Sequence, residues 1–137
     1  MKRRIAALGM TAASIAATLV GFAPTASAAT PNCTSETRIW QGDFYTDVPS
    51  TSSGSTNCVL RKGMTSDAVY RLQYTLWVCN GANSLGVDGI YGDETAGAVR
   101  IFQDRMHIGV DGTYGPQTRS AMYWVFNSKT DWYCGKI

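Results

Sequence analysis

The sequence predicts an all-α domain: a compact three-helix bundle preceded by an N-terminal arm that disulfides tie to it. Two observations support this prediction. Apolar residues recur at helical spacing in three segments, and a ten-residue pattern occurs twice, at residues 86–95 and 109–118, with seven identical positions. Such a repeat indicates one supersecondary unit that is used twice and packs against its own copy.

Residues 1–28 have the composition of a secretory signal peptide. They begin with the basic residues Lys2, Arg3 and Arg4, continue with an Ala-rich apolar segment, and end at the small-residue cleavage signature Ala26-Ser27-Ala28. The apolar segment is short and contains Gly and Thr, which argues against a lasting membrane anchor. We therefore expect a secreted protein, extracellular or associated with the cell wall, with no membrane contact after cleavage.

Cleavage would leave a nearly neutral chain. It removes three basic residues and no acidic one, so the 12 Lys and Arg become nine against ten Asp and Glu, a net charge of −1. No basic run remains, which argues against nucleic acid as a partner. The remaining residues are enough for one small domain.

An N-terminal arm and linker are expected at residues 29–57. The apolar and β-branched segments 37–41 and 44–48 flank Gly42-Asp43, which predicts a hairpin with a two-residue turn. Residues 49–57 have the Ser- and Thr-rich composition of a loose linker.

Three helices are expected in the compact domain, residues 58–126. The first begins near Thr65 or Ser66 and ends at Asn80-Gly81. The second begins near Asp93, and the third begins at Pro116. The expected core residues are Val69, Leu72, Leu76, Cys79, Val99, Phe102, Met106, Ala121, Met122 and Val125. No sheet is expected here, and residues 127–137 are expected to form an irregular tail.

Four cysteines (Cys33, Cys58, Cys79 and Cys134) follow the signal segment, and an even number in an exported chain predicts two disulfides. There is no Cys-x-x-Cys pair and the only histidine is His107, so we expect neither a metal site nor another cofactor. Of the three possible connectivities we favour Cys58–Cys79 with Cys33–Cys134, because residues 58–64 could run back along the first helix.

An ordered series of motifs resembles the family of small three-helix peptidoglycan-binding domains found on bacterial cell-wall hydrolases. The series consists of Leu60 to Gly63, Val69-x-x-Leu72-Gln73-x-x-Leu76, Asp88 to Thr95, Ala98-Val99-x-x-Phe102-Gln103, and Asp111 to Thr118. It spans about residues 58–125. The resemblance implies a non-catalytic module that holds its protein on the peptidoglycan wall. The cysteines and the arm depart from the family pattern, and the arm is too short to be a second enzyme domain.

The repeated turns supply four candidate ligand-binding residues. Asp88 and Asp111 could contact ligand hydroxyls or amides, although we favour the alternative that each carboxylate satisfies N–H groups of its own turn. Tyr91 and Tyr114 could line a cleft between the repeats or fill the core beside each turn, and the residues alone do not decide between these alternatives.

An aromatic row on the first helix supplies three more candidates: Tyr70, Tyr74 and Trp77. These residues share a stripe that lies roughly 150° from the centre of the core stripe on an ideal helix. An exposed aromatic row can stack on sugar faces and mark a binding surface. The alternative, which we favour, is that the arm covers the row with Trp40 and Phe44.

No catalytic residue is predicted. Wall hydrolysis needs paired carboxylates, a metal site, or an activated Cys or Ser. The two glutamates are Glu36 and Glu94, and Glu94 falls in a helix start, where an acid favours the helix dipole. The sequence therefore predicts non-catalytic binding of peptidoglycan. The alternative is an exported interaction protein that uses the same fold to bind a protein partner, and a cell-wall hydrolase is the least favoured hypothesis.

Overall fold

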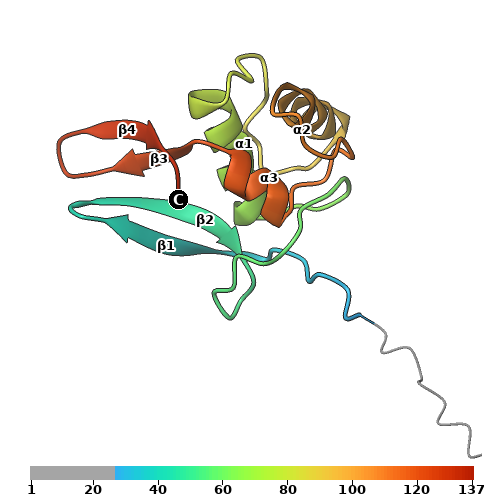
Figure 1. Ribbon diagram of the computed structural model, residues 1–137, viewed down its shortest axis with the longest axis horizontal. Coiled ribbons are helices and arrows are strands. Elements are labelled where there is room, and N and C mark those ends of the chain that lie inside the picture. The colour runs from blue at the N-terminus through green and yellow to red at the C-terminus, as the bar shows by residue number, and fades with distance from the viewer. Residues whose placement is uncertain (1–26) are drawn as a thin grey trace, which may run out of the picture.

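Residues 27–137, the part of the chain that the computed structural model describes, form three helices and four strands (Figure 1). The helices are α1 (Asp67–Cys79), α2 (Asp93–Arg105) and α3 (Pro116–Ala121). The strands are β1 (Ser35–Gln41), β2 (Phe44–Ser50), β3 (Trp124–Asn127) and β4 (Trp132–Gly135). The predicted all-α bundle is therefore wrong, because the fold is mixed α/β. The predicted signal peptide falls almost entirely on residues 1–26, outside the described part.

The N-terminal hairpin is confirmed. β1 and β2 pair antiparallel from Ser35↔Ser50 to Gln41↔Phe44. Gly42 adopts a φ of 61° in the turn, a conformation that favours glycine. β2 runs to Ser50, so the expected linker is shorter than predicted.

We had expected the C-terminal tail to be irregular, but it forms a second hairpin. β3 and β4 pair antiparallel from Trp124↔Gly135 to Asn127↔Trp132. Val125, expected in the third helix, lies in β3, because a run of aromatic and β-branched residues fits a pleated strand better than a helix. The two hairpins join into one sheet of order β1-β2-β3-β4, in which β2 and β3 are paired only at Tyr45↔Asn127.

The helices begin where the sequence predicts. The Ser66 side chain caps α1 by accepting a hydrogen bond from the Val69 N–H (3.3 Å), and Asn80 follows its last turn. α3 begins at Pro116 but ends at Ala121, since Met122 is extended with ψ 152°. No helix among residues 27–137 is long and apolar enough to cross a membrane.

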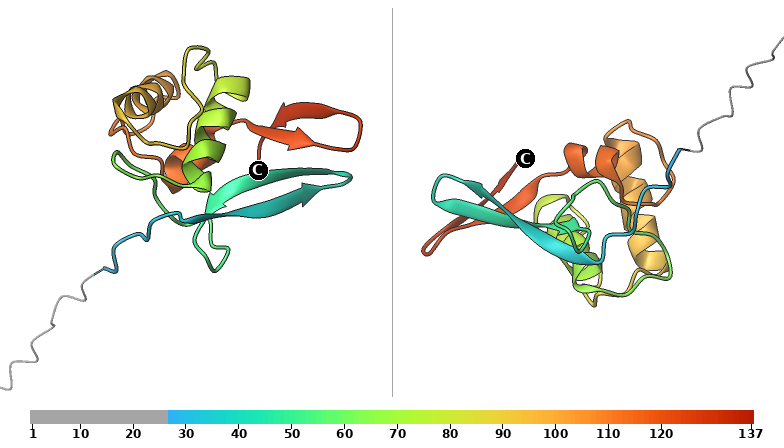
Figure 2. Two further views of the ribbon diagram at one scale, coloured as in Figure 1. Left: turned by 180° about the vertical axis from the view of Figure 1, so that it is seen from behind. Right: turned by 90° about the horizontal axis from the view of Figure 1, so that it is seen from below.

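One hydrophobic core joins the helices to the base of the sheet. It contains Leu72 of α1, Phe102 of α2 and Phe126 of β3, all buried. Both hairpins extend away from the helical part in the same direction (Figures 1 and 2). α1 is the helix that lies against strands of both hairpins, namely β1, β2 and β3.

Two disulfides are present, but the favoured pairing is wrong. Cys33 is bonded to Cys58, and Cys79 is bonded to Cys134. Residues 58–60 do not run back along α1. Instead Val59 accepts a hydrogen bond from the Cys33 N–H (2.9 Å), which places Cys58 beside Cys33. Cys79 then meets Cys134, because the second hairpin brings β4 to the end of α1.

Candidate functional site

The first repeat is organised by Gln73, a buried side chain of α1. Its Nε2 donates to Asp88 Oδ1 (3.0 Å), to the Ile90 carbonyl (2.9 Å) and to Thr95 Oγ1 (2.9 Å). Its Oε1 accepts from the N–H groups of Asp88 (3.0 Å) and Gly89 (2.8 Å). One amide therefore fixes the turn and joins α1 to the start of α2.

The second repeat reproduces this arrangement around Gln103 of α2, which is also buried. Its Nε2 donates to Asp111 Oδ1 (2.8 Å), to the Thr113 carbonyl (2.9 Å) and to Thr118 Oγ1 (3.1 Å). Its Oε1 accepts from the N–H groups of Asp111 (3.1 Å) and Gly112 (2.9 Å). The repeated sequence is thus a repeated polar network that links each helix to the next.

The two aspartates lie at the surface and serve their own turns. Asp88 Oδ1 accepts from the Ile90 N–H (2.9 Å), and Asp111 Oδ1 accepts from the Thr113 N–H (2.8 Å). The Ile90 N–H first, and the Gln73 amide second, lower the pKa of Asp88 below its ordinary value. These contacts agree with the alternative that each carboxylate satisfies N–H groups of its own turn. A ligand-binding role for either residue stays a prediction.

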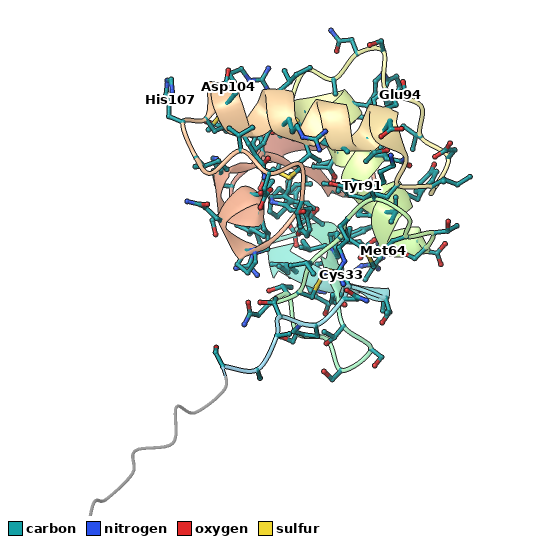
Figure 3. The ribbon with its side chains drawn as sticks, turned by 90° about the vertical axis from the view of Figure 1, so that its right-hand side faces the viewer. Cys33, Met64, Tyr91, Glu94, Asp104 and His107 are labelled. Carbon is teal, nitrogen blue, oxygen red and sulfur yellow. A yellow bond between two sulfur atoms is a disulfide. The ribbon has the colours of Figure 1, made fainter. Side chains whose placement is uncertain are left out.

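The two tyrosines lie in the core and line no cleft. Tyr91 and Tyr114 are fully buried, and burial raises the pKa of both hydroxyls. The Tyr91 hydroxyl donates to the Gly112 carbonyl (2.8 Å), which ties the first repeat to the second. Figure 3 shows Tyr91 beneath α2, with Glu94, Asp104 and His107 at the periphery along that helix. Both rings support the turns, so we leave them out of the candidate site.

The aromatic row of α1 is exposed to solvent. Tyr70 is 46% exposed and Trp77 is 47% exposed, while Tyr74 is half-buried between them. The favoured alternative, that the arm covers the row, is therefore wrong. Trp40, one of the residues expected to cover it, is itself 61% exposed.

A groove runs beside this row, between α1 and the sheet. It consists of two adjoining depressions, of about 400 and 550 Å³, that share Tyr74 and Asn127. The smaller depression is also lined by Tyr45, Asp47, Tyr70 and Arg71, and the larger by Trp77, Val78, Asn83 and Trp132. We call this surface the aromatic groove. Tyr45, Asn127 and Trp132 were not among the predicted site residues. The second hairpin, which supplies Asn127 and Trp132, was not expected, and neither was the position of β2, which supplies Tyr45, beside α1.

A separate, smaller depression of about 290 Å³ lies between residues 80–85 and α2. Its charged lining residues are already engaged: Glu94 Oε1 accepts from the Gly86 N–H (3.2 Å), and the Arg105 guanidinium donates to the Asn80 carbonyl. The remaining lining is mainly apolar, with Leu85, Ala98 and Ile101. This depression offers a ligand fewer aromatic surfaces than the aromatic groove.

The two glutamates and the four cysteines have structural partners. Glu36 forms an ion pair with Arg71 (2.9 Å), Glu94 binds the Gly86 N–H, and all four cysteines are oxidised. In residues 27–137, no three His, Cys, Asp or Glu side chains are grouped so that they could hold a metal ion. The aromatic groove thus offers stacking surfaces and hydrogen-bonding groups.

Residues 65–122 match the model of a family described as "Putative peptidoglycan binding domain". The chain belongs to this family. The matched segment contains all three helices and both repeats, and it ends before β3. Both hairpins, and with them Tyr45, Asn127 and Trp132, lie outside it.

Two solved structures are similar to this chain. One is the SleB N-terminal domain, with 36% identity, a TM-score of 0.43, and coverage of 46% of this chain and 85% of that one. The other is a peptidoglycan-binding protein from Clostridioides difficile in complex with glutamine hydroxamate, with 29% identity and a TM-score of 0.46. That match covers 61% of this chain and 53% of the other. No curated protein matches the chain significantly.

Proposed function

We propose that this protein binds bacterial cell-wall peptidoglycan as a small secreted module and does not cleave it. The observation that carries the proposal is the family match over residues 65–122, which includes α1, α2, α3 and both glutamine-centred networks. These networks hold α1 and α2 in fixed positions, so α1 can present a preformed surface to a rigid polymer. Preformed surfaces lose less conformational entropy when they bind.

The contacts of the two glutamates support the non-catalytic part of the proposal. A general acid needs a carboxyl that is available to the scissile bond, and a hydrolytic pair needs two such groups flanking it. Glu36 is held by Arg71 on the sheet side of α1, whereas Glu94 lies at the start of α2 beside Gly86. The two glutamates therefore belong to different surfaces and do not form a pair.

The disulfides support the proposed location. Both cysteine pairs are oxidised, and disulfides persist in extracellular and cell-surface compartments. A secreted module of this kind would meet peptidoglycan outside the membrane, where the wall lies.

Co-sedimentation with purified, protein-free peptidoglycan tests the proposal. We expect the oxidised protein to pellet with peptidoglycan and not with insoluble cellulose, a polysaccharide without acetamido groups or peptides. We also expect no soluble sugar or peptide fragments in the supernatant after prolonged incubation, with lysozyme as the positive control. Release of fragments above the protein-free background would contradict the non-catalytic assignment, and absence of retention would contradict peptidoglycan binding itself.

A further inference from the structure

We propose that the aromatic groove binds the glycan strand of peptidoglycan, a chain of N-acetylated amino sugars, rather than its stem peptides. This inference rests on the proposed function and deepens it by naming the part of the polymer that is contacted. It also assigns a role to the two hairpins, which lie outside the family segment.

The first argument is the placement of aromatic side chains along one groove. Tyr70, Tyr74 and Trp77 follow one another at helical spacing, and the Tyr74 and Trp77 ring centroids are 6.3 Å apart with their planes at 52°. Tyr45 joins them from β2, and Trp132 joins them from β4. Aromatic rings that are apolar on their faces and polar at their edges suit the apolar faces and polar rims of successive sugar rings.

A disulfide helps to fix the position of Trp132. Successive residues of a strand point to opposite faces, so Trp132 and Cys134 share one face of β4. Cys134 is bonded to Cys79 at the end of α1, which turns this face toward the helix. Trp132 is thereby held across the groove from Trp77, although it is 57% exposed and has little packing of its own.

The charged side chains at the wall of the aromatic groove neutralise one another. Arg71 pairs with Glu36 (2.9 Å) and lies 3.6 Å from Asp47, and Asp47 is also held by Arg38 (2.9 Å). The two carboxylates and two guanidinium groups neutralise one another at the groove wall. A surface without net charge suits the neutral hydroxyl and acetamido groups of a glycan, whereas stem peptides carry charged carboxylates and amines.

The fourth argument is the presence of side-chain amides between the rings. Asn127 lies where the two depressions meet, and Asn83 lines the larger one beside Trp77. Amides donate and accept hydrogen bonds at once, as acetamido and hydroxyl groups require. The groove therefore combines stacking surfaces with neutral polar groups, as sites for uncharged ligands commonly do.

Isothermal titration calorimetry with three soluble probes tests this inference. The probes are peptidoglycan glycan strands stripped of stem peptides by an amidase, with the lactyl carboxylates so exposed converted to neutral methylamides, free stem peptides, and chitin oligomers, which share the amino-sugar chemistry but come from another polymer. We expect the glycan strands to bind and the stem peptides not to bind. Stronger binding of stripped strands than of chitin oligomers would identify the wall as the source of the ligand.

Variants then locate the binding site. Trp77→Ala and Trp132→Ala are each expected to weaken glycan binding about tenfold, the effect of losing one aromatic contact. Tyr123→Ala is the matched control, because Tyr123 is 46% exposed but lines neither depression of the groove. Its affinity for glycan should equal that of the unaltered protein. Tyr70→Ala provides a second groove variant, at the other end, if one tryptophan variant fails to fold.

The two proposals fail in different ways. If the protein pellets with whole peptidoglycan but binds stem peptides and not stripped strands, the glycan assignment is overturned and the proposed function stands. If Trp77→Ala, Trp132→Ala and Tyr123→Ala bind glycan strands with equal affinity, the assignment of the glycan site to the aromatic groove is likewise overturned. If the protein does not pellet with whole peptidoglycan, the proposed function itself fails.

Discussion

Replacing Cys79 and Cys134 together by Ser is expected to lower the free energy of unfolding by about 4 kcal/mol. The bond closes a chain segment with a sequence separation of 55 residues, so its loss releases a large unfolded-state entropy. It also removes the covalent tie between β4 and α1, in a hairpin that is paired to β2 only at Tyr45↔Asn127. Urea unfolding followed by circular dichroism measures the change.

The double replacement of Cys33 and Cys58 by Ser is the matched control. That disulfide has a sequence separation of 25, and its loss should cost about 3.5 kcal/mol by the same relation. The two variants should therefore have similar stabilities but different binding. Only the variant without Cys79–Cys134 should lose retention on peptidoglycan, since that bond ties β4, the strand that carries Trp132, to the end of α1. Equal retention of the two variants would contradict a role for the tethered hairpin.

The variant Gln73→Ala is expected to destabilise the fold by about 3 kcal/mol. The substitution removes five hydrogen bonds and leaves the buried Gly89 N–H and Thr95 hydroxyl without the amide. Gln103→Ala should cause a loss of similar size, because the second network has the same partners. Gln117→Ala, at an exposed glutamine, should change stability by less than about 0.5 kcal/mol.

An isosteric variant, Gln73→Glu, separates the hydrogen bonds from the packing. The new carboxyl retains the shape and can still accept from the Asp88 and Gly89 N–H groups, but when ionised it faces Asp88 Oδ1 and the Ile90 carbonyl. Its pKa in the folded state is thus expected to rise, so the destabilisation relative to the unaltered protein should grow as pH rises above about 4.3. A destabilisation that is the same at pH 4 and pH 7 would contradict this account of the network.

The helix positions were predictable because their signals are local. Ser66, Asn80-Gly81 and Pro116 are capping and first-turn residues, and each marks a helix end in the structure. The first hairpin has an equally local signal at Gly42-Asp43. The second hairpin has a four-residue segment between its strands, and its aromatic residues follow closely after α3, so helical spacing and strand composition competed there.

The candidate site was predictable only in part, for a physical reason. Tyr70, Tyr74 and Trp77 are visible as a stripe because they belong to one helix. The partners that turn this stripe into a groove come from β2, β3 and β4, and the Cys79–Cys134 bond ties β4 to α1. Disulfide connectivity is not encoded in local sequence, so neither Trp132 nor Asn127 could be assigned to the site.

Hydroxyl-radical footprinting of the oxidised protein on intact peptidoglycan tests the central claim most directly. The method reports the solvent access of individual side chains, and the groove aromatics are exposed enough to react in the free protein. The account predicts that peptidoglycan protects Tyr70, Trp77 and Trp132 and leaves Tyr123 unchanged. Protection of Ile101 and its neighbours on α2, with the groove still reactive, would contradict it.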